Sequence, residues 1–190
     1  WGAKVEGKTS ATAIDTKVIM TGGSVDGDFY GVHVIVTDND TGVAEATGTT
    51  LTINGATLNN IRGAKVEGKE TGKANDTKVT ITGGELKETL NAAEVQANQD
   101  GSIGEANNTT LIINGTKITT HAAHIQGALV SSNAGGEILS ATGTTVKLNL
   151  HADSDMGNLT GVQDSGDTGH DEQANSTKAD KTEVAMNGGK

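Results

Sequence analysis

The chain has 190 residues and a formal net charge of −10, with 27 glycines and no proline or cysteine. The lack of cysteine excludes a disulfide framework and a cysteine-based metal site, and the negative charge argues against nucleic acid or an anionic membrane as partner. The apolar runs are far shorter than the roughly 18 residues that indicate a membrane span.

Six segments of alternating apolar residues follow one another along the chain, each opened by a threonine. They begin at Thr16, Thr49, Thr77, Thr109, Thr144 and Thr182, at intervals of 33, 28, 32, 35 and 38 residues, and each threonine has an alanine three positions before it. Apolar residues stand two and four positions after the threonine, as Val18 and Met20 do in the first segment. This period of two predicts a strand with one buried face.

Glycine corners end most of these segments and lead into a further apolar row. A Gly-Gly or Asn-Gly pair follows every segment except the fifth, which reads Asn-Leu-His-Ala at 149–152. The sequence predicts that the apolar residues beyond the corners, Val25, Leu58, Leu86 and Ile118, also point inward.

A second motif lies between these segments, at 3–7, 32–36, 64–68, 93–97, 123–127 and 160–164. We expect its central residues to form one inward column: Val5, Val34, Val66, Val95, Ile125 and Val162. The residues before them vary in charge, which predicts a solvent face: Lys4, His33, Lys65, Glu94, His124 and Gly161. This alignment places His33 and His124 at the same position of different coils.

A period near 30 residues, with short strands and glycine or asparagine corners, indicates an all-β protein: a parallel β-solenoid, or right-handed β-helix. We expect a single domain over 1–190, with about six coils of 28–38 residues. Low hydrophobicity and high charge would by themselves favour disorder, and a β-sandwich of short strands is the alternative fold. Neither explains why one motif recurs six times. The sequence also predicts a long acidic loop excursion at 149–176.

Three stretches carry a resemblance to a known group of proteins. Residues 44–55 (AEATGTTLTING), 16–31 (TKVIMTGGSVDGDFYG) and 74–86 (ANDTKVTITGGEL) resemble the passenger repeats of bacterial autotransporter adhesins. The resemblance implies a right-handed β-helix displayed outside the cell or on its surface, where it serves adhesion or acts as a stalk. Its partner would be a host or bacterial surface ligand.

Acidic loops are the candidate sites. Asp38 with Asp40, and Asp153 with Asp155, have the oxygen spacing that Ca²⁺ favours, although solvated loops explain the same residues. No other cofactor is expected. The excursion is the candidate partner-binding loop, because loops on a rigid scaffold carry much of the function of such proteins. Its residues in question are Asp164, Asp167, His170, Asp171 and Glu172.

Both ends of the sequence match only part of a repeat, which predicts open coil ends. The chain is therefore either a slice of a longer solenoid or a subunit that stacks head to tail into a filament. The residues that would meet in such a stack include Trp1, Lys4, Val5, Val184 and Met186.

The function expected from these features is structural or adhesive, without enzymatic activity. No nucleophile motif or phosphate-binding loop occurs in the sequence, and a single Arg and three aromatic residues are a poor basis for a polysaccharide-degrading site. Ice binding requires a regular array of outward threonines. Lys17, Lys78 and Glu183 interrupt the array that the leading segments would form.

Overall fold

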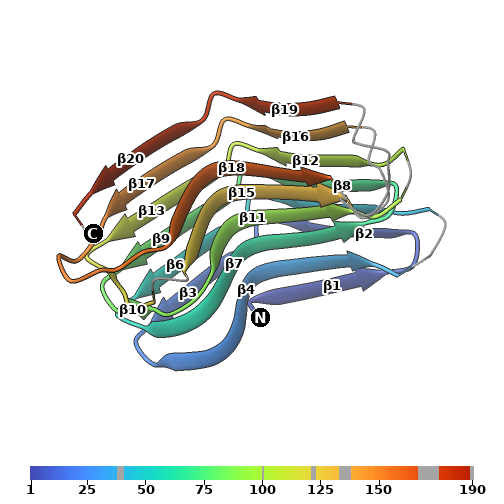
Figure 1. The fold of residues 1–190 in the computed structure, drawn as a ribbon. Coiled ribbons are helices and arrows are strands. Elements are labelled where there is room, and N and C mark those ends of the chain that lie inside the picture. Colours follow the sequence, from blue (N-terminus) through green and yellow to red (C-terminus); the bar gives the residue numbers. More distant parts are fainter. Residues whose placement is uncertain (38–40, 100, 121–122, 133–137, 167–175, 189–190) are drawn as a thin grey trace.

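The protein is a parallel β-solenoid built from three long sheets (Figure 1). The computed structural model describes residues 1–37, 41–99, 101–120, 123–132, 138–166 and 176–188. Every regular element in these ranges is a β-strand. The described part of the chain contains no helix long and apolar enough to cross a membrane. The predicted fold class is confirmed.

Each turn of the chain contributes one strand to each sheet. Sheet A has the order β1 (Ala3–Gly7), β4 (Ser24–Val36), β7 (Thr57–Gly68), β11 (Leu90–Ala97), β15 (His124–Ser132) and β18 (Asn158–Gly166). The short strand β10 (Glu85–Leu86) pairs with the first residues of β7, and the short strand β14 (Lys117–Ile118) pairs with β10. Sheet B is β2 (Ser10–Ile14), β5 (Val43–Thr47), β8 (Thr71–Asn75), β12 (Ile103–Asn107), β16 (Ile138–Thr142) and β19 (Ser176–Asp180). Sheet C is β3 (Lys17–Thr21), β6 (Thr50–Asn54), β9 (Lys78–Thr82), β13 (Thr110–Asn114), β17 (Thr145–Asn149) and β20 (Glu183–Asn187). The predicted coils therefore correspond to six layers of strands, joined by five full turns of chain.

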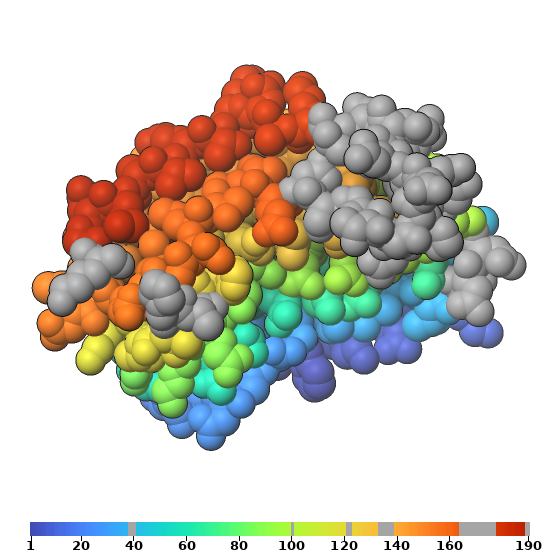
Figure 2. Space-filling view, viewed as in Figure 1, coloured from blue at the N-terminus to red at the C-terminus, as the bar shows by residue number. Residues whose placement is uncertain are grey.

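The layers are stacked in chain order, so the colours of the space-filling view run in bands from blue at one end of the rod to red at the other (Figure 2). Sheet C has the predicted register in every layer. Its two inward columns are Val18, Leu51, Val79, Leu111, Val146 and Val184, and Met20, Ile53, Ile81, Ile113, Leu148 and Met186. The row of Val25, Leu58, Leu86 and Ile118 is likewise confirmed.

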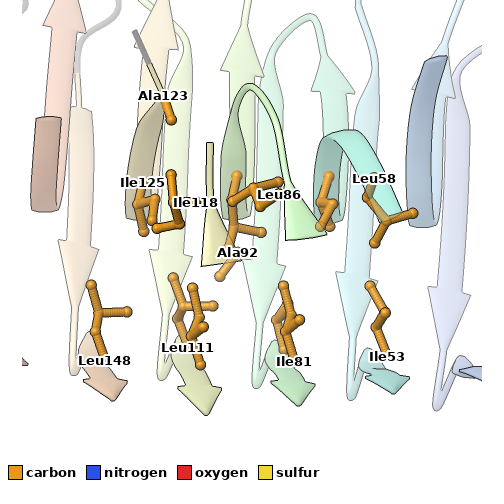
Figure 3. Packing of buried hydrophobic residues seen from close by; sticks show 14 of the residues in the cluster. Ile53, Leu58, Ile81, Leu86, Ala92, Leu111, Ile118, Ala123, Ile125 and Leu148 are labelled. Carbon is orange, nitrogen blue, oxygen red and sulfur yellow. The ribbon is translucent and has the colours of Figure 1, made fainter. Parts of the chain in front are cut away.

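Two apolar clusters fill the solenoid. One contains leucine and isoleucine from sheet C and from the first half of the sheet A strands, including Ile53, Leu58, Leu111 and Ile125 (Figure 3). The other contains mainly alanine and valine from sheet B and the second half of sheet A. Ile53 and Leu111 are fully buried, and each such side chain stabilises the fold by about 1.5–3 kcal/mol. These ladders replace the aromatic core that the composition excludes.

The corner from sheet B to sheet C has the same length in every layer. Strand β2 ends at Ile14 and β3 begins at Lys17, and the two residues between them recur in all later layers. The first of the two has positive φ in each layer: Asp15, Gly48, Asp76, Asn108, Gly143 and Lys181. Glycine, asparagine and aspartate adopt this backbone conformation most readily, which explains every residue of the column except Lys181.

The connection from sheet A to sheet B varies instead. It comprises residues 8–9, 37–42, 69–70, 98–102, 133–137 and 167–175 in successive layers. The differences in repeat length therefore arise mainly here and in the connection 150–157 between β17 and β18.

The register of sheet A differs from the prediction in the last two layers. Val95 pairs with Val130, and Val130 with Asp164, whereas Ile125 pairs with Leu90 and Leu159. The predicted column that joined Val95, Ile125 and Val162 is therefore wrong. His33 and His124 also occupy different columns, because the His33 column continues through Lys65 and Glu94 to Leu129.

The predicted excursion at 149–176 is not a single loop, because β18 lies within it and pairs with β15 along its whole length. The part before β18 packs against the solenoid. Ser154 is buried, donates from Oγ to Thr116 O at 3.3 Å and accepts from Ile118 N at 3.2 Å. Asp155 N donates to Ile118 O at 2.9 Å. Residues 150–157 thus lie beside the glycine corner and the short strand β14 of the layer before.

Candidate functional site

Sheet A bends where its strands pass from one apolar cluster to the other. The column at the bend is Gly2, Gly31, Gly63, Ala92, Gly127 and Gly161, and most of these residues leave no room for a side chain. A Cβ on Gly63 would lie 2.3 Å from Ala92 O and 2.4 Å from Val79 Cγ2. One on Gly127 would lie 2.5 Å from Cγ2 of the leading threonine Thr144. Glycine lets the backbone of sheet A approach sheet C at this column.

The bend brings residues three positions apart in a strand onto one outer face. In a flat strand such residues point to opposite faces. Here Asn91 Nδ2 donates to Glu94 Oε2 at 2.8 Å, and the rings of Tyr30 and His33 stack with centroids 4.9 Å apart. We name the polar residues that meet here the bend cluster: Asp28, Tyr30, His33, Arg62, Lys65, Glu67, Asn91 and Glu94.

Arg62 is the centre of the bend cluster. Its Nε donates to Glu94 Oε2 at 2.6 Å, and its Nη1 lies 3.2 Å from Asp28 Oδ1. Its Cζ lies 5.5 Å from the centroid of the Tyr30 ring, an arrangement that adds a cation–π attraction. Arg62 therefore links the layers of β4, β7 and β11.

A second ion group lies beside the first. Lys65 Nζ is 2.9 Å from Glu67 Oε1 and 3.8 Å from Glu94 Oε1, and His33 Nε2 is 2.7 Å from Glu67 Oε1. Glu94 is only 4% exposed and His33 only 9%. The prediction of a solvent face for the column of Lys65 and Glu94 is therefore wrong in these layers, because the bend encloses these side chains between neighbouring layers.

Aromatic rings extend the cluster towards the first layer. Trp1 stacks on Tyr30 with centroids 6.2 Å apart and an interplanar angle of 21°. Trp1 is 70% exposed while Tyr30 is buried. Tyr30 also donates from its hydroxyl to Asp28 Oδ2 at 2.8 Å.

The contacts within the cluster shift the pKa values of Asp28, Tyr30, Arg62 and Glu67 away from neutral pH. The hydrogen bond from Tyr30 and the charge of Arg62 lower the pKa of Asp28 despite partial burial. Burial opposes ionisation of Glu67, yet the hydrogen bonds from Lys65 and His33 bring its pKa below the usual value. Burial and the bond to Asp28 raise the pKa of Tyr30 to about 12. Burial favours the neutral form of Arg62, but the charge of Glu94 and its hydrogen bond to Arg62 outweigh this effect and raise the pKa of Arg62. Groups with such pKa values form ion pairs and hydrogen bonds. They differ from a general acid or base, which works best with a pKa near the ambient pH.

Of the site residues predicted from the sequence, those that the structure describes do not converge on one place. Asp153 is exposed and lies 3.8 Å from His151 Nδ1, and Asp155 is exposed on the same connection. Asp38 and Asp40 lie outside the described residues, as do Asp167, His170, Asp171 and Glu172. Asp164 is in β18, opposite Val130. Within the described ranges, no group of three histidines, cysteines or acids could hold a metal ion. The Ca²⁺ site stays a prediction.

The residues named for self-association lie at the two ends of the rod. Lys4 and Val5 lie in β1, which pairs with β4, and Trp1 precedes it. Val184 and Met186 lie in β20, which pairs with β17. Val184 is 45% exposed and Met186 44%, whereas their column neighbours Val146 and Leu148 are buried.

Sequence reasoning missed the bend cluster. Arg62 is the single arginine of the chain, and Tyr30, its single tyrosine, occupies the same column one layer before it. This shared column, together with the opposite charges of Lys65 and Glu94 in neighbouring layers, was the feature of the sequence that could have indicated the cluster.

Comparisons with known proteins leave the family open: no family model, no curated protein and no solved structure matches this chain.

Proposed function

We propose that this chain is a structural and adhesive β-solenoid that works outside the cell or on its surface and has no enzymatic activity. The observation that carries the proposal is the contrast between two edges of one rod. The corner from sheet B to sheet C has the same length in every layer. The connection from sheet A to sheet B varies in length, from the short connection at residues 8–9 to the long one at residues 167–175.

The uniform part supports a stiff scaffold. Three parallel sheets join each layer to the next, and identical or similar side chains stack in buried columns. Bending the rod would have to separate strands in at least one sheet and open an apolar column. A stalk or spacer requires this resistance.

The variable part supports recognition. The four longer connections between sheets A and B leave the sheet A strands and enter the sheet B strands along a single edge of the solenoid. They contain acids and no lysine or arginine: Asp38, Asp40, Asp100, Glu137, Asp167, Asp171 and Glu172. Loops that differ in length on a constant scaffold are where binding residues concentrate.

The bend cluster supports a role without catalysis. Contacts with Tyr30 and Arg62 lower the pKa of Asp28, contacts with Lys65 and His33 lower that of Glu67, and the pKa of Tyr30 is raised to about 12. These contacts tie the layers of β4, β7 and β11 together at the bend. The extracellular setting is inferred from the resemblance of residues 44–55 to adhesin passenger repeats.

Adhesion tests this proposal directly. Beads coated with the chain are passed over a panel of bacterial and animal cells and over a glycan array, with and without Ca²⁺. The matched control is a variant in which residues 167–175 are replaced by the Lys-Thr pair found at 8–9, with its fold checked by circular dichroism. We expect retention of the native chain on at least one surface and reduced retention of the variant. Retention on no surface, or turnover of a polysaccharide on the array, would contradict the proposal.

A further inference from the structure

The outer face of sheet C differs in chemistry from the outer faces of the other two sheets. Strands β3, β6, β9, β13 and β17 run side by side along the rod (Figure 1). Their outward side chains are threonine, asparagine and lysine, with two isoleucines. They form three columns: Lys17, Thr50, Lys78, Thr110 and Thr145; Ile19, Thr52, Thr80, Ile112 and Lys147; and Thr21, Asn54, Thr82, Asn114 and Asn149.

The outer faces of sheets A and B use their polar groups in contacts between layers. On sheet B, Lys73 Nζ lies 2.9 Å from Glu105 Oε2, and on sheet A the bend cluster is held together in a similar way. On the five strands of sheet C, no outward side chain forms a hydrogen bond with another described residue. Their one ion pair to a described acid joins Lys147 Nζ to Glu183 Oε1 at 3.7 Å. The hydroxyl, amide and ammonium groups of this face are therefore available to a ligand.

Three lysines give this face a positive charge, although the chain as a whole carries −10. Lys17, Lys78 and Lys147 lie in β3, β9 and β17, and no Asp or Glu occurs in the five strands. Successive lysines are two layers apart, which at about 4.8 Å between neighbouring strands is roughly 10 Å along the rod. One positive charge therefore recurs at this distance, with uncharged hydroxyl and amide groups between.

The corner from sheet B to sheet C contains acids that do not neutralise these lysines. Asp15 and Asp76 stand two positions before two of the lysines. Asp76 Oδ1 accepts from Asn108 Nδ2 at 3.0 Å, and Asp15 Oδ1 lies against Gly48. Both carboxylates thus lie beside the corner of the next layer, and within the described ranges neither forms an ion pair with a lysine.

We propose that the outer face of sheet C binds an extended acidic polysaccharide that lies along the rod and has a carboxylate on every second sugar residue. Two sugar residues of an extended chain are about as long as two layers of strands. The carboxylates pair with the lysines, and the sugar hydroxyls exchange hydrogen bonds with side chains between them, such as Asn54 and Thr82. The inference rests on the adhesive role proposed above and adds a partner class to it, at a site separate from the connections between sheets A and B.

Nucleic acid fits this face less well than such a polysaccharide. Duplex DNA carries one negative charge per about 1.7 Å of helix axis, which is far denser than one lysine per roughly 10 Å. Proteins that bind single strands stack the bases on aromatic or arginine side chains. Neither residue type occurs in the five strands.

Hyaluronate, in which glucuronate alternates with N-acetylglucosamine, is a suitable probe. The neutral control is hyaluronate whose carboxyl groups have been reduced to alcohols. Biolayer interferometry of the 190-residue chain on each immobilised polymer measures affinity at low and at physiological ionic strength. We expect binding to native hyaluronate that salt weakens, and binding to the reduced polymer that is weaker by about tenfold or more.

Lys78→Gln removes the central charge of the face and should weaken binding by about threefold or more. The matched control is Lys73→Gln, which removes the same charge from the outer face of sheet B in the same layer and should leave binding unchanged. Both variants change the net charge of the chain equally, so a difference between them reports on sheet C. Thr80→Lys adds a charge to the face and should strengthen binding. Circular dichroism shows that each variant is folded.

The absence of hyaluronate binding at low ionic strength would overturn the inference. So would equal losses in Lys78→Gln and Lys73→Gln, equal affinity for native and reduced hyaluronate, or tighter binding to duplex DNA. The variant in which residues 167–175 are replaced should keep its affinity for hyaluronate even where its retention on cells falls. Retention of the native chain on cells without hyaluronate binding would reject this inference and leave the proposed function standing.

Discussion

Arg62 and Glu94 join two layers of sheet A by a hydrogen bond of 2.6 Å from Nε to Oε2, at the point where the sheet bends. Glu94 is almost fully enclosed and also accepts from Asn91. The pair therefore belongs to the class of buried ion pairs, in which loss of one partner leaves an uncompensated charge.

Arg62→Met tests the importance of this pair for stability. The variant leaves Glu94 without its main partner, so we expect the free energy of unfolding to fall by about 2–4 kcal/mol. Urea denaturation followed by circular dichroism measures it. The control is Lys4→Met, which removes an ion pair whose side chains are 43% and 53% exposed and should change stability by no more than about 0.5 kcal/mol. Similar losses in both variants would mean that the enclosure of Glu94 is not what makes the pair important.

Gly63→Ala tests the close approach of sheet A to sheet C. The added Cβ would meet Ala92 O and Val79 Cγ2 at under 2.5 Å, and we expect a loss of about 3 kcal/mol in unfolding free energy. The control is Gly27→Ala, where a Cβ meets no atom within 4 Å. Thermal unfolding of both variants gives the comparison. A Gly63→Ala protein as stable as the native chain would argue against the bend as described.

Ile81→Asp and Thr80→Lys test which face of sheet C is inward. Ile81 is buried in β9 and Thr80 is its outward neighbour. A carboxylate among Ile53 and Ile113 should cost at least about 4 kcal/mol or abolish cooperative unfolding, while Thr80→Lys should stay within about 0.5 kcal/mol. Equal effects in a denaturation experiment would contradict the assignment of the two faces.

The pH dependence of stability follows from the bend cluster. The folded pKa values of Glu67 and Asp28 are lowered, so their contribution is complete above the ordinary values of 4.5 and 3.8 and is lost as the pH falls below them. The pKa of Tyr30 is raised from 10.0 to about 12, so its contribution is complete below pH 10 and is lost as the pH rises towards 12.

Urea midpoints measured from pH 2 to 12 should therefore decline at both ends of the range. Tyr30→Phe keeps the ring and removes the ionisable group. It should flatten the decline that Tyr30 causes between pH 10 and 12, and an unchanged alkaline limb would show that Tyr30 does not contribute there.

The sequence predicted sheet C in full and sheet A only in part, for a physical reason. In sheet C the strands are straight, so alternation of period two identifies the inward column from Val18 to Val184 without ambiguity. At the bend of sheet A the parity changes. Leu90 and Val95 are an odd number of positions apart, yet both are buried. A pattern search that assumes unbroken alternation can therefore place Ile125 in either column.

The bend cluster could not be predicted from the sequence, for a related reason. The charges of Lys65 and Glu94 suit a solvated face equally well, and only the bend turns them towards their neighbours. Sequence alone can place two residues in one column, but it does not show that Asn91 and Glu94, three positions apart, share a face.

The two-residue corner from sheet B to sheet C, which is the same in every layer, allows whole layers to be duplicated. A duplicated layer carries its own corner and its own inward apolar pair in sheet C, so a longer rod needs no new solution for its cross-section. Genetic change in such a protein separates into two kinds: copying of whole layers alters reach, and replacement of a connection between sheets A and B alters what the rod presents to its surroundings.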